Sequence, residues 1–146
     1  MWKIRVECMF SAAHRLLNYE GPCGRLHGHN WKVVVVLEGD ELNRNGMLMD
    51  FRTVKQIIAE FDHKVLLKSS DPLVEVLRKA DQEVIELSVN PTCEDLARII
   101  AWKILRYETK VQRVTVRLYE TPNQWAEYTV ERTPESLTDS TCTVWW

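Results

Sequence analysis

The sequence is poor in the residues that mark unusual protein classes. Its 146 residues include five glycines, five prolines and four cysteines, and the formal net charge is −2. With 45% hydrophobic and 27% charged residues, the composition excludes a disordered or a collagen-like chain. The length fits a single domain, residues 1–146, and a protein of this size buries roughly 70% of the surface of its unfolded chain. We therefore expect a core that needs no disulfide bonds.

Long apolar runs and an excess of one charge are also missing. No stretch approaches the roughly 18 consecutive apolar residues of a membrane span, and the N-terminus MWKIRVECMF has no signal-peptide core. Lysine and arginine (19) nearly balance aspartate and glutamate (21), so no nucleic-acid partner is expected. The cysteines are expected to be thiols in a reducing compartment. The sequence thus predicts a soluble cytoplasmic protein that binds neither membranes nor nucleic acid.

Hydrophobic periodicity predicts seven elements. Period-two patterns or β-branched runs predict strands at 2–10, 27–39, 111–120 and 125–131. Helical spacing and capping residues predict helices at 50–63, 71–80 and 92–104. Residues 83–89 are expected to form at most a short extended piece. The order ββ, helices, ββ predicts an α+β fold, with an antiparallel four-stranded sheet covered on one face by helices.

Histidine is scarce as well, with four in the chain, and three of them fall where two expected strands meet. His27 and His29 begin the second strand, where residues two apart point to the same face. His14 follows the end of the first strand, so antiparallel pairing would bring it level with the other two. Three neutral imidazoles with an open fourth position form a catalytic zinc site. The alternative is ordinary surface or core histidines near a turn.

Cys23 stands four residues before His27, in a loop rich in glycine and proline. It could be a fourth zinc ligand that closes a structural Cys-His₃ site, or a base or nucleophile just outside the metal shell. A nearby cation favours the thiolate in either case. Cys8 and Cys93 are expected to be structural thiols. The same holds for Cys142, whose tail TDSTCTVWW would end in a strand or an assembly contact.

Six motifs, in order along the chain, closely resemble the 6-pyruvoyltetrahydropterin synthase / 6-carboxytetrahydropterin synthase family. They are FSAAH (10–14), CGRLHGH (23–29), GMLMDF (46–51), FDH (61–63), NPTCEDLA (90–97) and ETP (120–122). Three residues separate Cys23 from His27, as in the carboxytetrahydropterin synthases of queuosine biosynthesis, whereas the pyruvoyl enzymes typically carry a longer insertion. Six motifs in register make this resemblance far more specific than the HGH triplet alone.

The resemblance implies a zinc-dependent lyase. Its substrate would be 7,8-dihydroneopterin triphosphate, and its products 6-carboxy-5,6,7,8-tetrahydropterin, acetaldehyde and triphosphate. The alternatives are a 6-pyruvoyltetrahydropterin synthase, which eliminates triphosphate, and a non-catalytic pterin-binding module. The family's tunnelling fold assembles as trimeric β-barrels that stack into homohexamers, with sites at subunit interfaces. Basic residues for the triphosphate are therefore expected from a neighbouring subunit.

Residue roles follow from the same resemblance. The zinc ligands would be His14, His27 and His29. Cys23 would accept a proton from the substrate side chain, and Asp62 with His63 would relay a proton at the opposite face. Without the resemblance, the Asp-His pair would be no more than a favourable charge placement at a helix end.

Pterin recognition is assigned to two further residues. Glu120 would anchor the ring, because the exocyclic amino group and a ring NH offer two adjacent donors to one carboxylate. It falls on the apolar face of its expected strand, where an unpaired carboxylate is costly to bury. Thr92, with its neighbours Asn90 and Pro91, would line the pterin pocket through backbone groups. Taken alone, Glu120 would be a solvated carboxylate at a strand end.

Overall fold

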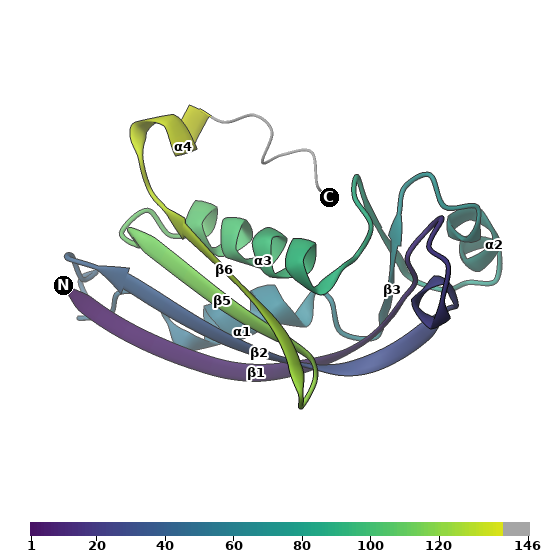
Figure 1. The fold of residues 1–146 in the computed structure, drawn as a ribbon. Helices are drawn as coiled ribbons and strands as arrows, with labels where there is room; N and C mark the ends of the chain where they lie inside the picture. Colours follow the sequence, from purple (N-terminus) through teal and green to yellow (C-terminus); the bar gives the residue numbers. More distant parts are fainter. Residues whose placement is uncertain (139–146) are drawn as a thin grey trace.

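The computed structural model describes residues 1–138, so the expectation for the tail around Cys142 lies outside the described residues. The elements are β1 (Trp2–His14), the 3₁₀ helix η1 (Pro22–Gly24), β2 (His27–Gly39), α1 (Phe51–Ala59), β3 (Lys64–Lys68), α2 (Leu73–Lys79), β4 (Val84–Leu87), α3 (Cys93–Tyr107), β5 (Arg113–Thr121), β6 (Gln124–Glu131) and α4 (Pro134–Thr138) (Figure 1). All seven expected elements are present, and β1 runs four residues further than expected, to His14.

The sheet is larger than predicted and is mixed. It has six strands in the order β4-β3-β1-β2-β5-β6. The strands β1, β2, β5 and β6 pair antiparallel, as expected. In contrast, β3 pairs parallel with the end of β1, at residues 12–14, and β4 pairs parallel with β3. The prediction of a four-stranded antiparallel sheet is therefore wrong by these two strands.

Of the two additional strands, β4 falls within the short extended piece expected at residues 83–89, whereas no sequence pattern indicated β3, for a physical reason. β3 has five residues and β4 has four, and the adjacent Leu66 and Leu67 of β3 are both fully buried. A strand covered on both faces lacks the alternation that marks a half-exposed one. The turn into β3 uses His63 in the left-handed region, with φ 58°. The backbone N–H of His63 donates to the carbonyl of Ser11, 2.6 Å away, and this bond brings β3 beside β1.

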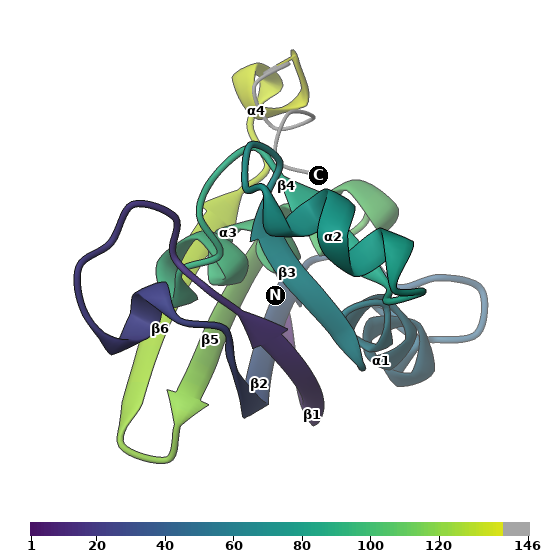
Figure 2. The ribbon, with the colours of Figure 1, turned by 90° about the vertical axis from the view of Figure 1, so that its right-hand side faces the viewer.

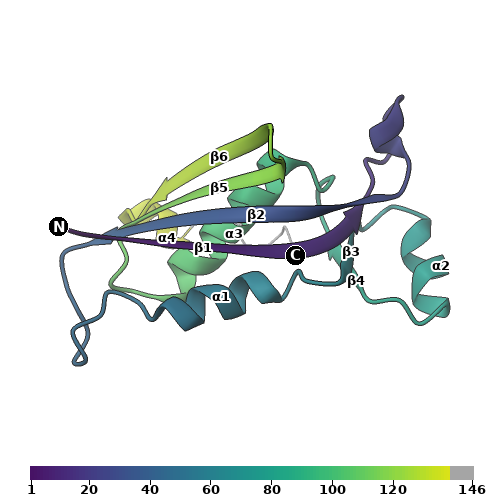
Figure 3. The ribbon, with the colours of Figure 1, turned by 90° about the horizontal axis from the view of Figure 1, so that it is seen from below.

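Helices α1 and α3 cover one face of the sheet and close the core (Figures 1 and 3). The apolar positions expected on α3 are all fully buried: Leu96, Ile99, Ile100 and Ile104. Both helices begin with a side-chain cap, and the one at Thr92 was expected from the sequence. Asp50 Oδ1 accepts from the backbone N–H of Arg52 at 2.8 Å, and Thr92 Oγ1 accepts from that of Asp95 at 3.1 Å.

One end of the molecule gathers the elements that surround the histidines. Figure 2 looks at this end, with the loop between β1 and β2 on the left, β3 in the middle and α2 on the right. The buried carboxylate of Asp71, just before α2, accepts a 2.7 Å hydrogen bond from Nε of Arg15, the residue after β1. This ion pair fixes α2 to the end of β1. None of the helices in residues 1–138 is long and apolar enough to cross a membrane.

Candidate metal centre

The end of the β1–β2 hairpin places three histidines side by side. His14 is the last residue of β1 and pairs directly with His27, while Ala12 pairs with His29. The sequence led us to expect His14 just after the first strand, but it is the last residue of that strand. Because side chains alternate along a strand, His27 and His29 share the helix-covered face with the fully buried Trp31. The hairpin register alone thus brings the three imidazoles together.

The ligand atoms of these histidines converge with one carboxylate. His14 Nε2 lies 3.1 Å from His27 Nε2, and His29 Nε2 lies 3.3 Å from Glu120 Oε1. One ligand atom from each of the four residues lies within 4.8 Å of all the others. Convergence of this kind is hard to reconcile with ordinary histidines beside a turn. The group has the size and composition to hold a metal ion.

Two backbone carbonyls orient the imidazoles. Nδ1 of His14 donates to the carbonyl oxygen of Pro91 at 2.8 Å, and Nδ1 of His27 donates to that of Arg25 at 2.6 Å. Since Nδ1 carries the proton in each case, the lone pair of a neutral ring is left on Nε2, which faces the other ligands. Metal-binding histidines typically have such outer partners.

Burial favours the neutral form of the His14 and His29 rings. Desolvation is the main reason why the pKa of His14 lies below its usual value, and the same cause lowers the pKa of His29. Neutral imidazole is the form that binds metal. Trp31 restricts the rings further: its Nε1 donates to the carbonyl of Ala12 at 3.2 Å, and its ring lies edge-on to both histidines.

The donor set fits a zinc ion. His29 Nε2 is buried and makes no hydrogen bond, although Glu120 is near, so a ligand that accepts its lone pair would satisfy it. Three imidazole nitrogens are a common catalytic zinc set, and a carboxylate oxygen is also compatible with zinc. The residues present therefore suit the ion that the sequence led us to expect.

Cys23 lies in η1, close by in sequence but outside this group. The carbonyl of Cys23 accepts from the backbone N–H of Leu16 at 2.9 Å, which closes the base of the loop between β1 and β2. The next residue must be small, since a Cβ on Gly24 would lie 2.4 Å from the carbonyl oxygen of Tyr19. Among residues 1–138, the ligand cluster contains the three histidines and Glu120 but not Cys23. This placement favours a role outside the metal shell.

Asp62 and His63 form a pair on the other side of β1. Asp62 Oδ1 accepts from the backbone N–H of Ser11 at 2.8 Å, and its Oδ2 lies 2.9 Å from His63 Nδ1. The bond from Ser11, followed by the contact with His63, holds the pKa of Asp62 below its usual value. The side chain of His63 is 82% exposed. The pair exists as expected, but it points to solvent and not into the histidine cluster.

Glu120 and Thr92 lie on two elements that meet beside the cluster. Glu120 follows Leu118 on the buried face of β5, as expected. Thr92 caps α3, and the next residue, Cys93, donates from Sγ to the carbonyl of Leu118 at 3.0 Å. Burial, the largest influence, raises the pKa of the Cys93 thiol to about 11. The start of α3 is therefore held against the strand that carries Glu120.

Three contacts of the site were not predicted. They are the bonds to the backbone carbonyls of Arg25 and Pro91, and those made by the side chain of Asn90 with the backbone of Leu17. Backbone acceptors have no signature in a sequence. For Asn90 there was a signal, because an asparagine before proline and a helix cap is typical of a structural turn, but its partner could not be predicted.

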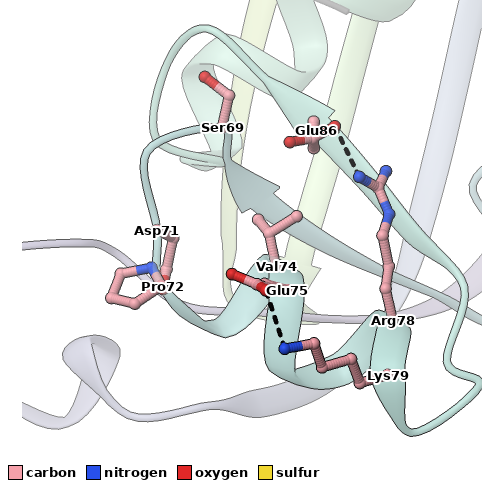
Figure 4. A pocket seen from close by; sticks show the side chains of 8 residues that line it. All are labelled: Ser69, Asp71, Pro72, Val74, Glu75, Arg78, Lys79 and Glu86. Carbon is pink, nitrogen blue, oxygen red and sulfur yellow. Dashed lines mark hydrogen bonds and ion pairs between the residues drawn. The ribbon is translucent and has the colours of Figure 1, made fainter.

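A separate cavity of about 610 Å³ lies between α2 and β4 (Figure 4). Four of its five charged side chains pair with one another, Arg78 with Glu86 at 2.8 Å and Lys79 with Glu75 at 2.9 Å, and the fifth, Asp71, pairs with Arg15. None of the site residues expected from the sequence lines it. The chemistry of the histidine cluster therefore does not extend into this cavity.

Comparison with known proteins was consistent across sequence and structure. The family model described as 6-pyruvoyl tetrahydropterin synthase matches residues 3–131. A Halobacterium salinarum protein named "Probable 6-carboxy-5,6,7,8-tetrahydropterin synthase" is 36% identical over 115 residues, which are 77% of this chain and 76% of the relative. The Haemophilus influenzae 6-carboxy-5,6,7,8-tetrahydropterin synthase is 30% identical over 141 residues, covering 88% of this chain and 99% of that one.

Among solved structures, the 6-pyruvoyl tetrahydropterin synthase of Plasmodium vivax superposes with a TM-score of 0.67. The match covers 90% of this chain and 98% of the other at 18% sequence identity. At this identity the likeness concerns the fold, including the arrangement of sheet and helices described above.

Proposed function

The chain belongs to the 6-pyruvoyl tetrahydropterin synthase family, and on that premise we propose that it is a 6-carboxy-5,6,7,8-tetrahydropterin synthase. Its substrate would be 7,8-dihydroneopterin triphosphate, and the products 6-carboxytetrahydropterin, acetaldehyde and triphosphate, for queuosine-type 7-deazapurine synthesis. The convergence of three histidine nitrogens with Glu120 carries the proposal. A purely structural zinc site would leave Glu120 and the Asp62–His63 pair without a role.

We assign zinc to His14, His27 and His29, whose Nε2 atoms face one another or the nearby carboxylate. When bound, zinc would act as a Lewis acid that acidifies the side-chain hydroxyls of the substrate. The protein's own contribution is to favour the neutral form of His14 and His29 by burial, and to orient the rings of His14 and His27 by carbonyl acceptors.

Proton transfer is assigned to two groups on different sides of β1. Sγ of Cys23 would take a proton from the substrate side chain. Asp62 holds Nδ1 of His63, which leaves Nε2 of that ring free to exchange a proton with the substrate. The fixed N–H of Ser11 in turn holds the carboxylate.

Glu120 is the proposed anchor of the pterin ring, with the backbone around Thr92 as the adjoining wall. A carboxylate at the end of a buried strand face can accept two parallel hydrogen bonds from the ring. In this role Glu120 fixes where the side chain of the substrate meets the metal, which determines the bond that can react.

Two observations favour the carboxy product over the pyruvoyl product. The named relatives at 30% and 36% identity are 6-carboxy enzymes. The three-residue spacing between Cys23 and His27 also matches the carboxytetrahydropterin synthases, because the pyruvoyl enzymes typically carry a longer insertion there. A 6-pyruvoyltetrahydropterin synthase is the second candidate, since the solved structure with the same fold carries that name.

The proposed active unit is an oligomer, a trimeric β-barrel or a hexamer of two. In one protomer the His63 side chain faces solvent, away from the histidine cluster. The first half of β1 pairs only with β2, and β6 lies at the end of the sheet, so both present a free strand edge within residues 1–138. Pairing of such edges would close a barrel.

Product analysis tests the proposal. Zinc-loaded protein incubated with 7,8-dihydroneopterin triphosphate should give carboxytetrahydropterin and acetaldehyde by mass spectrometry. Pyruvoyltetrahydropterin as the main product would establish the second candidate, and tight binding without product would indicate a binding module.

The variant Cys23→Ala separates catalysis from metal binding. It should lose turnover by at least about 100-fold, as expected for a lost general base, while binding zinc stoichiometrically. The control Cys8→Ala, on β1 away from the loop, should keep both properties. Loss of zinc from Cys23→Ala would instead make Cys23 a ligand.

A further inference from the structure

Four consecutive residues, 90–93, connect the start of α3 to the end of β1 and to β5. The side chain of Asn90 binds the backbone of Leu17, the carbonyl of Pro91 accepts from His14, Thr92 caps α3, and Cys93 donates to β5. Of these contacts, that of Asn90 reaches the loop that carries Cys23. None of the other hydrogen bonds named here reaches that loop.

Asn90 makes two hydrogen bonds to a single residue. Its Oδ1 accepts from the backbone N–H of Leu17 at 2.9 Å, and its Nδ2 donates to the carbonyl of the same residue at 3.1 Å. The side-chain amide thus satisfies both backbone groups of Leu17, as a neighbouring strand would do. Asn90 is itself held, because its own carbonyl accepts from the N–H of Thr92 at 2.8 Å.

The contact continues to the reactive thiol through the backbone. Leu16, next to Leu17, donates its N–H to the carbonyl of Cys23 at 2.9 Å. The residue after Asn90, Pro91, holds the metal-ligand ring of His14 at 2.8 Å. One dipeptide therefore fixes a ligand of the metal cluster and the base of the loop bearing the thiol.

We propose that Asn90 is a positioning residue that sets the distance between the Cys23 thiol and the metal held by the histidines. This inference rests on the proposed function, since it assumes that Cys23 reacts beside a bound zinc. Asn90 itself touches neither the substrate nor the metal in this arrangement.

The substitution Asn90→Asp is the sharpest test because it keeps the size and Oδ1 but replaces the donor with an oxygen. That oxygen would face the carbonyl of Leu17, so one bond is lost and a repulsion takes its place. Asn43→Asp is the matched control: Asn43 uses only its Oδ1, accepting from Asn45 and Met47, in a turn of another loop.

Three properties are measured for the wild type and for each variant. Zinc affinity should stay within about threefold of wild type, since His14, His27 and His29 are unchanged. The value of kcat should fall about 10- to 100-fold with KM little changed, the usual effect of losing an outer partner. The third readout is alkylation of Cys23 by iodoacetamide, followed by peptide mass spectrometry with and without zinc.

Zinc should change the alkylation rate of Cys23 to the same extent in the wild type and in the control variant Asn43→Asp. This response should be lost or reduced at least about tenfold in Asn90→Asp, because a displaced thiol no longer senses the ion. A merely structural role would lower the melting temperature and leave the zinc response intact. An unchanged zinc response and kcat in Asn90→Asp would overturn the proposal.

Hydrogen exchange on the wild type covers the case in which Asn90→Asp does not fold. The backbone N–H groups of Leu16 and Leu17 should exchange as slowly as those of a strand. Exchange at the rate of an open loop would show that Asn90 does not hold the backbone of Leu17, and this would overturn the proposal. If the wild type turns over no dihydroneopterin triphosphate, the proposed function fails, whereas the alkylation and exchange data still decide the role of Asn90.

Discussion

Glu120 has two possible partners, because it lies within reach of a metal ion and of the proposed pterin ring. Its Oε1 lies 3.3 Å from His29 Nε2, and it belongs to the group that could hold a metal. The sequence suggested only the pterin role. A single substitution distinguishes the two, since a ring anchor and a metal ligand fail in different ways.

We expect Glu120→Gln to weaken pterin binding and spare the metal. Loss of charge-assisted hydrogen bonds of about 1.5–3 kcal/mol should raise the Kd for 7,8-dihydroneopterin about 10- to 100-fold. Fluorescence titration measures this Kd, and a chelator competition measures zinc affinity. The control is Glu127→Gln, because Glu127 is an exposed residue of β6 that pairs with Arg117 of β5. A Kd that does not change, together with weaker zinc binding, would make Glu120 a metal ligand.

The thiol of Cys93 should be alkylated slowly in the folded protein. A pKa of about 11 instead of 9.0 lowers the thiolate fraction at pH 8 about 100-fold relative to the unfolded chain. Its alkylation in the folded protein should be correspondingly slow, and should speed up about tenfold per pH unit toward pH 11. Peptide mass spectrometry in buffer and in urea gives the two rates. Equal rates would show that the thiol is not held against Leu118.

At this scale the sequence identified residue types better than their partners. All three histidines expected to bind metal do converge, because strand register places them. His63 was expected beside the substrate, yet it faces solvent within the protomer. The hydrogen bond that orients His14 is accepted by a carbonyl 77 positions away, a partner that no local pattern can reveal.

Among the elements, α2 is joined to the end of β1 by a buried ion pair. Arg15 binds the fully buried carboxylate of Asp71, which also accepts from the N–H of Leu73 at 2.9 Å. Removing the charge leaves the guanidinium without its partner. We expect Asp71→Asn to lower the free energy of unfolding by about 3 kcal/mol, measured by urea denaturation.

The pH dependence of this stabilisation has a definite sign. The bond from Arg15 is the main reason why the pKa of Asp71 lies below its usual value of 3.8. The contribution is therefore fully present above pH 3.8 and is lost as the pH falls through the lower pKa of the folded state. The difference between wild type and Asp71→Asn should shrink in that range. Glu75→Gln, which breaks an exposed pair with Lys79, should cost less than about 0.5 kcal/mol at any pH.

The elements that could be predicted from the sequence are those with one solvent-exposed face and one buried face. Alternation along β1, β2 and β5 and the helical spacing on α3 are direct results of half burial. The segment KVLLK of β3 shows no such pattern, since neighbouring leucines are both buried. Its parallel pairing with β1 also joins segments separated by a whole helix, which sequence order does not indicate.

For the whole molecule, the orientation of His63 leads to a test of shared active sites. If Cys23 of one subunit works with His63 of the next, the variants Cys23→Ala and His63→Ala should each be inactive. Refolded together in equal amounts, they should recover about a quarter of wild-type activity, because one in four interfaces then has both groups intact. Activity that stays absent in the mixture, with oligomers formed, would place both groups in one subunit.

The hairpin that bears the histidines has a consequence for the order of folding. His14 and His27 are 13 positions apart, whereas the bond from His14 to Pro91 spans 77. Loop-closure entropy makes the longer contact costlier by about 1.6 kcal/mol. We therefore expect the hairpin to bring its histidines together early in folding, and the acceptor that sets the tautomer of His14 to arrive only when the distant segment docks. If the histidines bind a metal as proposed, capture of the ion and orientation of His14 are then separate steps of folding.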